Sequence, residues 1–385
     1  MAQPKGILLV SEVYPPAIGG SGVLLENLYT RLDGIAVRVL AHGDSTWRMQ
    51  NGLRVDTVSM IAPDWGLRTP AAGVRYLRVA RRIRQASTAL DVIHCGRALP
   101  EGLSALLSGR PYACWLHGEE LGYASTSREL KWLMRHVYRR ASAILANSHN
   151  SARLLDRWGV DATRITVIHP GVDHTRFHPA ADGASFRKTL APHGEVLLLS
   201  VGRLQRRKGH DRVLSALAGW TPQDPPVRYA IAGDGECRRD LEQRAQALGL
   251  GDRVTFLGAV GEQSLPALYA ASDIFVMPNR DDGVDFEGFG IVFLEAAATG
   301  KPTIGGRSGG VVEAVADSET GLLVDGENVA QLTTALKRLA GDPSLRRALG
   351  EAGRRRVLEQ FTWAQGAHSV RQLQLALSVG RRTDE

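Results

Sequence analysis

The sequence predicts an α/β protein made of two doubly wound domains, each built on a mostly parallel sheet. The 385 residues exceed what one hydrophobic core usually organises. Short runs rich in Val, Ile and Leu alternate with helical segments, which is typical of strands buried on both faces of a parallel sheet. This alternation starts again after a stretch rich in proline and glycine, "HPGVDHTRFHPAADG" at 169–183, which predicts a linker.

The expected strands fall into two sets of six. The first set lies at 6–11, 37–43, 91–96, 112–118, 143–148 and 165–171. The second set lies at 196–204, 228–235, 254–260, 273–279, 302–306 and 321–325. Helices are expected between them, for example at 237–249 and 265–272. Alternating strands and helices in two sets favour two sheets of the doubly wound kind.

The domain boundaries follow from this pattern. We expect an N-terminal domain at 1–175, a second domain at 176–360, and an amphipathic C-terminal segment at 361–385 that packs back on the first domain. Open α/β sheets bind ligands beyond the carboxyl ends of their strands, where most glycine loops of this sequence lie. A cleft between the two domains is therefore the expected ligand site.

The net charge of +7 belongs to the first half of the chain. Residues 1–178 carry 22 Lys and Arg against 14 Asp and Glu, whereas 179–385 carry 25 against 26. The segments 75–84 and 128–140 are rich in arginine, and the second has an amphipathic helical pattern. Such a helix either packs its apolar face on the core while its basic face is solvated, or its basic face binds an anionic membrane or an acidic acceptor. The basic segments lack the interleaved aromatic residues and the motifs that are typical of nucleic-acid binding, so nucleic acid is not an expected partner.

The hydrophobic segments and the cysteines indicate where in the cell the protein is expected. No apolar run approaches the ~20 residues of a membrane-spanning helix, and "GILLV" is shorter than a signal-peptide core. We expect a cytoplasmic protein, with peripheral attachment to the inner face of the membrane left open. Cys95, Cys114 and Cys237 lack metal-ligand spacing and are expected to be reduced, mostly buried thiols.

The first glycine loop does not carry a dinucleotide fingerprint, which argues against a nicotinamide dehydrogenase. Leu25 stands where the third glycine should be, and Arg238 takes that place in "GDGECR". P-loop lysine, zinc-type His/Glu and Gly-x-Ser-x-Gly motifs are also absent. Gly19 and Gly20 precede an apolar helix, so this loop is either a phosphate-binding helix start or a tight turn.

The second domain places cations and carboxylates in its loops. Arg203 and Lys208 follow the strand at 196–204, where they either neutralise a diphosphate or are solvated loop charges. In "DFEGFGIVFLE", Glu287 precedes a glycine loop whose helix start can face phosphates. Glu295 lies inside the expected helix, and a buried carboxylate needs a partner. We predict that Glu287 binds hydroxyls of a transferred sugar and Glu295 those of a ribose, unless Glu295 pairs with an arginine or faces solvent.

"EGFGIVFLE" resembles the Glu-x7-Glu motif of the retaining family 4 glycosyltransferases. These enzymes have the GT-B fold, two facing Rossmann-like domains with a cleft between them. Further matching motifs are "YPPAIGG", "HGEE", "ANS", "HPGVD", "GRLQRRKG", "IAGDG", "LPALYAASDIFVMPN" and "SGGVVEAV". The long loop "NRDDGVDFEGFG" is most similar to that of the branch containing phosphatidylinositol mannosyltransferases.

The resemblance implies an activity. It implies transfer of mannose or another hexose, with retention, from a GDP-sugar or UDP-sugar to an acceptor hydroxyl. The acceptor would be a glycan or a lipid-linked substrate bound by the N-terminal domain, and the second domain would bind the sugar nucleotide. An epimerase or hydrolase on the same fold, or a non-catalytic sugar-nucleotide-binding protein, is the alternative.

The resemblance also implies site residues. Its catalytic positions are His117, Arg203, Lys208 and Glu287, with Arg203 and Lys208 on the diphosphate and His117 beside the donor sugar. Without the resemblance, His117 is equally well interpreted as a functional histidine or as a hydrogen-bonded histidine of the core. The implied donor-binding positions are Gly19, Gly20, Arg203, Lys208, Val260, Gly288, Phe289, Gly290, Ile291 and Glu295. No metal or other cofactor is expected, because the cations already stabilise the leaving charge, although "DDGVD" at 281–285 leaves metal stimulation open.

Overall fold

The computed structural model describes residues 6–16, 19–43, 47–60, 65–87 and 90–380. Residues 17 and 18 of the "YPPAIGG" loop, and 381–385 of the expected C-terminal segment, lie outside the described residues. The chain divides into two compact units. One contains 1–170 together with 363–385, and the other contains 171–362.

The first unit is built on an eight-stranded sheet in the order β3-β4-β2-β1-β5-β6-β7-β8. Its strands are β1 (Gly6–Ser11), β2 (Val37–His42), β3 (Trp47–Gln50), β4 (Leu53–Val58), β5 (Leu90–Cys95), β6 (Tyr112–Leu116), β7 (Ala143–Ala146) and β8 (Ile165–Val167). Every residue of β1, β6 and β7 is buried, as predicted for strands covered on both faces. Neighbouring strands run parallel except for β3 and β4.

Helices cover this sheet. They are α1 (Gly20–Tyr29), α2 (Pro70–Ala86), α3 (Leu103–Ser108), α4 (Glu119–Ser125), α5 (Arg128–Arg140), α6 (His149–Asp156) and α15 (Trp363–Gly380). The side chain of Ser127 caps the N-terminus of α5 by accepting a hydrogen bond from the backbone N–H of Leu130. The amphipathic pattern is confirmed, because the apolar residues spaced along one face of α5 are all buried: Leu130, Leu133, Met134, Val137 and Tyr138. Cys95 and Cys114 are buried free thiols, and Cys237 is half-buried.

Strands β3 and β4 were not predicted, so the expectation of six strands in the first half was wrong. They form a hairpin around Asn51 and Gly52, whose φ angles are 46° and 80°. Positive φ at both central residues is the signature of a type I′ turn, for which Asn-Gly is the preferred pair. The Asn-Gly pair is therefore the signal that could have located the hairpin. Strand β4 then pairs in parallel with β2 and extends the sheet.

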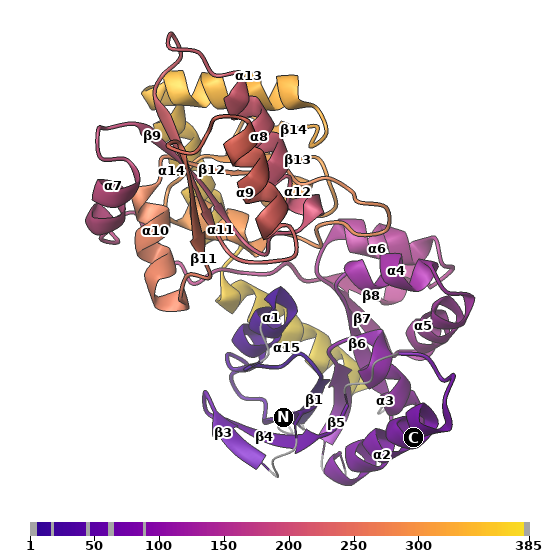
Figure 1. Cartoon of the computed structure of the whole chain (residues 1–385). Helices are drawn as coiled ribbons and strands as arrows, with labels where there is room; N and C mark the ends of the chain where they lie inside the picture. Colours follow the sequence, from indigo (N-terminus) through magenta and orange to yellow (C-terminus); the bar gives the residue numbers. More distant parts are fainter. Residues whose placement is uncertain (1–5, 17–18, 44–46, 61–64, 88–89, 381–385) are drawn as a thin grey trace. The chain divides into compact units, whose positions relative to one another are not determined.

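Helix α15 packs beside α1 in the first unit, where Figure 1 shows the yellow C-terminal helix next to the indigo α1. A series of hydrogen bonds between buried polar side chains connects α15 to α1 and β5. The hydroxyl of Tyr29 lies 2.6 Å from Nδ1 of His94, and Nε2 of His94 lies 3.2 Å from Oε1 of Gln374 in α15. Burial lowers the pKa of His94 to about 4. The imidazole is therefore neutral, with one nitrogen accepting and the other donating.

The second unit has six parallel strands in the order β11-β10-β9-β12-β13-β14. They are β9 (Val196–Val201), β10 (Val227–Ala232), β11 (Val254–Gly258), β12 (Ile274–Met277), β13 (Thr303–Gly306) and β14 (Gly321–Val324), each within one residue of the predicted start. The helices are α7 (Ala184–Leu190), α8 (His210–Ala218), α9 (Arg238–Ala247), α10 (Leu265–Ala271), α11 (Ile291–Ala298), α12 (Val311–Ala314), α13 (Val329–Gly341) and α14 (Pro343–Gln360). This strand order is that of the Rossmann fold. The strands are added on one side of β9 up to β11 and on the other side from β12 onward, so the switch point lies between β9 and β12.

Two hydrophobic cores lie on opposite faces of the second sheet. Leu197 and Leu199 of β9 belong to one core and Leu198 to the other, because side chains alternate along a strand. The predicted α/β class with two doubly wound sheets is therefore confirmed. Within the described ranges, we find no helix with the length and apolar character needed to span a membrane.

Candidate active site

The loops at the carboxyl edge of the second sheet gather most of the predicted site residues. Lys208 follows β9, Glu287 follows β12, and Gly309 follows β13. These strands are neighbours, and the order of the sheet reverses between β9 and β12. Such a switch point is where doubly wound sheets bind their ligands.

Glu287 is the centre of a buried polar cluster. Its Oε2 accepts hydrogen bonds from Nζ of Lys208 (2.5 Å), Nη1 of Arg207 (2.7 Å) and Nδ2 of Asn279 (2.9 Å). Burial by itself raises the pKa of Glu287, but the charges and hydrogen bonds of Lys208 and Arg207 outweigh burial and lower the pKa below its ordinary value. Glu287 is therefore a carboxylate held by two cations.

The two predicted diphosphate ligands differ in their surroundings. Lys208 is buried and its ammonium group contacts Glu287. Arg203 is exposed, and its guanidinium makes no hydrogen bond or ion pair with the described part of the chain. Arg207 and Asn279 were not predicted as site residues. Arg207 stands inside "GRLQRRKG", but the sequence alone does not show which cation of this loop turns inward.

The acidic loop "DDGVD" is held by neighbouring side chains. Arg206 lies 3.7 Å from Asp282, and Arg207 lies 3.0 Å from Asp285. Asp281 accepts a hydrogen bond of 2.6 Å from the hydroxyl of Ser308. These carboxylates therefore fix the loop that carries Glu287 to the loops after β9 and β13.

Glycines allow the loops at this edge to approach closely. A Cβ on Gly309 would lie 2.0 Å from the carbonyl oxygen of Glu287, and its φ is +53°. The N–H of Gly310 donates to that same carbonyl at 2.9 Å. Gly290 has a φ of 90° and stands at the N-terminus of α11. Gly288 is half-buried, whereas Phe289 is buried and packs into the core of this unit.

Glu295 lies in α11, as predicted, and is half-buried. Its Oε2 accepts a 2.7 Å hydrogen bond from the hydroxyl of Tyr269. Burial raises the pKa of Glu295, and the hydrogen bond from Tyr269 and the charge of Arg176 reduce that rise. Val260 packs half-buried against the core that contains Tyr269. Ile291, the first residue of α11, is also half-buried.

His117 lies in the first unit, directly after β6. Its Nε2–H donates to the carbonyl of Gly96 at 2.9 Å, and its backbone N–H donates to Oε1 of Glu120 at 2.8 Å. The ring stacks on Trp115 with centroids 6.1 Å apart. Burial is the main cause that lowers the pKa of His117. The neutral ring therefore keeps Nδ1 as a hydrogen-bond acceptor, for which the described residues supply no donor.

A buried acidic cluster beside His117 was not predicted. The backbone N–H of Glu12 donates to Oε1 of Glu101 at 2.8 Å, and Arg97 lies 3.5 Å from Glu12 and 3.4 Å from Glu119. Burial raises the pKa of Glu101 to about 8, with a contribution from the charge of Glu12. Glu12 and Arg97 follow β1 and β5, the strands at the switch point of this sheet. Charged residues directly after apolar strands are the signal that could have identified them.

Gly19 and Gly20 lie at the start of α1 in the first unit and are both exposed. The carbonyl of Gly19 accepts from the N–H of Val23 at 3.2 Å, so the helix begins at this loop. The first N–H groups of a helix have no partner within it. The helix begins with an exposed residue, Gly20, whereas Gly22 is already buried.

Two family models match the chain. The model described as Glycosyltransferase Family 4 matches residues 18–176, and the model described as Glycosyl transferases group 1 matches residues 182–356. Among solved structures, Anabaena HepE in complex with UDP has a TM-score of 0.80 at 21% identity and covers 96% of this chain and 100% of its own. Sucrose-phosphate synthase from Thermosynechococcus elongatus has a TM-score of 0.81 at 25% identity, covering 98% and 100%.

Curated relatives match over nearly the whole chain or over a large part of it. The GDP-mannose-dependent alpha-(1-6)-phosphatidylinositol monomannoside mannosyltransferase of Mycolicibacterium smegmatis is 30% identical and covers 93% of this chain and 95% of its own. The D-inositol 3-phosphate glycosyltransferase of Geodermatophilus obscurus is 36% identical over 61% of this chain and 52% of its own. These relatives favour sugar transfer over the epimerase or hydrolase alternative. The chain therefore belongs to the family 4 glycosyltransferases, and it is an enzyme that transfers a sugar from a nucleotide sugar to an acceptor.

Proposed function

We propose that the enzyme is a retaining mannosyltransferase that uses GDP-mannose and glycosylates an acceptor of the phosphatidylinositol type. The observation that carries this proposal is the match to the Mycolicibacterium smegmatis enzyme, which extends over 93% of the chain. The clustering of Lys208 and Glu287 at one sheet edge supports it, because donor binding requires a cation and a hydroxyl ligand near each other. UDP-sugars remain the alternative donors.

In this proposal the 171–362 unit holds the donor. Glu295 binds ribose hydroxyls through the carboxylate oxygen that Tyr269 leaves unoccupied. Arg203 and Lys208 bind the diphosphate, together with the first N–H groups of α11. The exposed guanidinium of Arg203 is available for a bidentate contact, because the described residues do not engage it. Gly288, Phe289 and Gly290 shape the loop that leads to these N–H groups.

The reaction proceeds on one face of the sugar. The bond between the anomeric carbon and the diphosphate oxygen breaks, the acceptor oxygen forms the new bond on that face, and the acceptor proton passes to the departing diphosphate. Glu287 is not the nucleophile of a double displacement in this proposal. Three donors occupy its Oε2 and two of them are cations, so its charge is already compensated. Electrostatic stabilisation of the leaving diphosphate supplies the main catalytic effect, without a required metal.

The 1–170 unit holds the acceptor in this proposal. Glu12 and Arg97 offer polar contacts to the acceptor at the edge where Nδ1 of neutral His117 accepts a hydrogen bond from a hydroxyl of the donor sugar. Helix α2 exposes Val74 and Leu77 beside several arginines, a combination suited to an anionic membrane surface. We therefore propose a peripheral location at such a surface, in keeping with a lipid acceptor.

Transfer assays test this function. GDP-mannose, UDP-glucose and UDP-galactose are each incubated with the full chain and phosphatidylinositol monomannoside, phosphatidylinositol or D-inositol 3-phosphate, with and without EDTA. We expect product only with GDP-mannose and a lipid acceptor, with the α configuration retained in the NMR spectrum and no loss on chelation. Faster transfer from vesicles containing phosphatidylglycerol than from neutral vesicles is expected for a peripheral enzyme. An inverted product or a strict requirement for a UDP-sugar would contradict the proposal.

Glu295→Ala should weaken donor binding with a smaller effect on kcat. Loss of a hydrogen bond to a charged group is expected to raise the KM for the donor by about tenfold or more. The matched control is Tyr269→Phe, which removes the hydroxyl bound to Glu295 but keeps the carboxylate and the ring. A Glu295→Ala enzyme with the KM of the wild type would show that Glu295 does not bind the ribose.

A further inference from the structure

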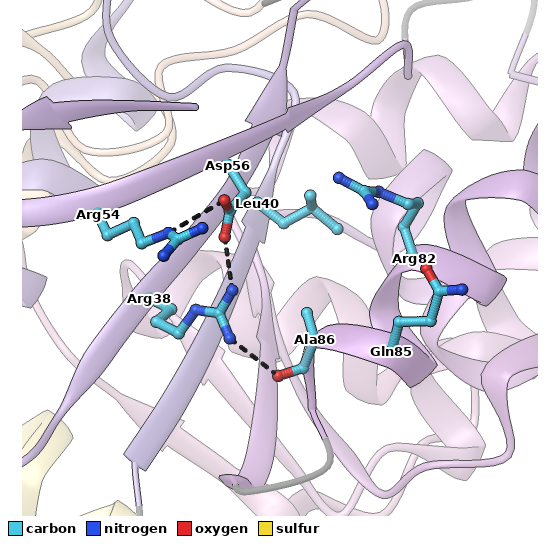
Figure 2. A pocket seen from close by; sticks show the side chains of 7 residues that line it. All are labelled: Arg38, Leu40, Arg54, Asp56, Arg82, Gln85 and Ala86. Carbon is cyan, nitrogen blue, oxygen red and sulfur yellow. Dashed lines mark hydrogen bonds and ion pairs between the residues drawn. The ribbon is translucent and has the colours of Figure 1, made fainter. Parts of the chain in front are cut away.

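A pocket in the first unit contains three arginines and a single carboxylate. Its volume is about 210 Å³. The residues that line it are Arg38, Leu40, Arg54, Asp56, Arg82, Gln85 and Ala86, as Figure 2 shows. The first two come from β2, the next two from β4, and the last three from the C-terminal turns of α2.

The pocket lies away from the candidate active-site edge. Arg38 and Arg54 are the second residues of β2 and β4, so they stand near the amino ends of these strands. Glu12 and His117 follow the carboxyl ends of β1 and β6, which belong to the same parallel run of strands. Four residues separate Arg38 from the carboxyl end of β2, or about 13 Å at 3.3 Å per residue. The pocket is therefore separate from the edge that carries Glu12 and His117.

The charges inside the pocket do not balance. Arg38 and Arg54 are direct partners in the pairing of β2 with β4, so two like charges stand side by side. Both share the carboxylate of Asp56, at 2.7 Å from Arg38 and 3.2 Å from Arg54. Figure 2 shows the guanidinium of Arg82 directed from α2 toward Leu40. Among the described residues, the guanidinium of Arg82 has no hydrogen-bond or ion-pair partner.

We propose that this pocket binds a phosphate group, carried either by a soluble phosphate ester or by the headgroup of an anionic lipid. Three guanidinium groups against one carboxylate leave an excess of two positive charges, which a phosphate dianion balances. Planar guanidinium groups also match the oxygens of a phosphate in geometry. The volume admits a phosphate with several further atoms, and Leu40 and Ala86 provide an apolar wall for them.

Arg82→Gln is the most informative variant, and Arg78→Gln is its matched control. Both residues are exposed arginines of α2, and both substitutions remove one positive charge, but Arg78 does not line the pocket. Replacing Arg82 leaves the pairs of Asp56 with Arg38 and Arg54 intact, so the variant is expected to fold. The donor-binding unit is the same in both variants, so phosphate bound there cancels in the comparison.

The first arm measures thermal stabilisation of the full chain by inorganic phosphate and by glycerol 3-phosphate, at an ionic strength held constant with chloride. Arg82→Gln is expected to weaken the fitted affinity by about tenfold, the loss of one charge-assisted hydrogen bond, whereas Arg78→Gln is expected to match the wild type. The second arm measures co-sedimentation with phosphatidylcholine vesicles that contain or lack phosphatidylglycerol.

The two arms separate the sources of the phosphate. A selective defect of Arg82→Gln with the soluble phosphates alone assigns the pocket to a phosphate ester, and a selective defect on phosphatidylglycerol vesicles assigns it to a lipid headgroup. Equal behaviour of the two variants in both arms overturns the proposal. Neither arm requires sugar transfer, so the result is independent of the proposed donor and acceptor.

Discussion

Replacing Arg203 with alanine is expected to lower kcat by about 10²–10³-fold, the usual effect of removing one group that stabilises charge in the transition state. In the proposed reaction the charge develops on the departing diphosphate, and we assign its stabilisation to Arg203, an exposed cation in the loop after β9. The free energy of unfolding should change by less than about 0.5 kcal/mol, because no described residue depends on this side chain for a contact. Steady-state kinetics and urea unfolding measure the two effects.

Arg206→Ala is the control for that experiment. Arg206 lies three residues further along the same loop and is also exposed, but it is directed to Asp282 at 3.7 Å. Its loss removes the same charge from the loop, so general electrostatic effects on donor binding are shared by both variants. A kcat for Arg203→Ala close to that of Arg206→Ala would refute the assignment of Arg203 to the leaving group.

Glu287→Ala is expected to destabilise the protein by about 3–5 kcal/mol, because removing one partner of a buried ion pair leaves an uncompensated charge. Here Lys208 would remain buried without the carboxylate of Glu287, and Arg207 would keep its pair with Asp285. Glu327→Ala is the matched control, since Glu327 also contacts two arginines but is half-exposed, and both arginines, Arg212 and the buried Arg280, also pair with Asp211. Exposed pairs contribute about 0–1 kcal/mol. Equal unfolding free energies for the two variants would show that the Glu287 cluster does not stabilise the fold.

The effect of Glu287→Ala should depend on pH. The folded state lowers the pKa of Glu287 below its ordinary value of 4.5, so this carboxylate stabilises the protein most fully above that value. The stabilisation is lost as pH falls from 4.5 through the lower pKa of the folded state. The difference in unfolding free energy between wild type and Glu287→Ala should therefore be constant near neutral pH and shrink in acid. A difference that stays constant in acid would contradict the lowered pKa.

The strands were the most predictable part of the fold. The run at 196–204 contains consecutive apolar residues, and β9 uses them to contact the cores on both faces of the sheet. Such a pattern needs no tertiary information, because a strand covered on both faces has no polar side to display. Strand β3 gives no such signal, since its residues are exposed or half-buried and only the Asn-Gly turn marks it.

The candidate site was predictable in composition but not in its contacts. The motifs predicted Lys208 and Glu287 as site residues, yet they are 79 positions apart, and their 2.5 Å contact exists only because β9 and β12 are neighbours. Arg207 and Arg203 belong to the same basic loop, and the sequence does not distinguish the one that turns inward to Glu287 from the one that stays exposed. Buried Glu101 was missed for the same reason, since its partner Glu12 is 89 positions away.

By itself, the sequence determined the α/β class, the two sheets, the amphipathic helices and the family, because these depend on local periodicity and on short motifs of adjacent residues. The tertiary structure alone decided which charges meet. It placed Arg38 beside Arg54 through the pairing of β2 with β4, and it surrounded Glu287 with two cations. The physical reason is that Coulomb interactions and burial depend on distances in space, which strand order sets and which residue spacing along the chain does not record.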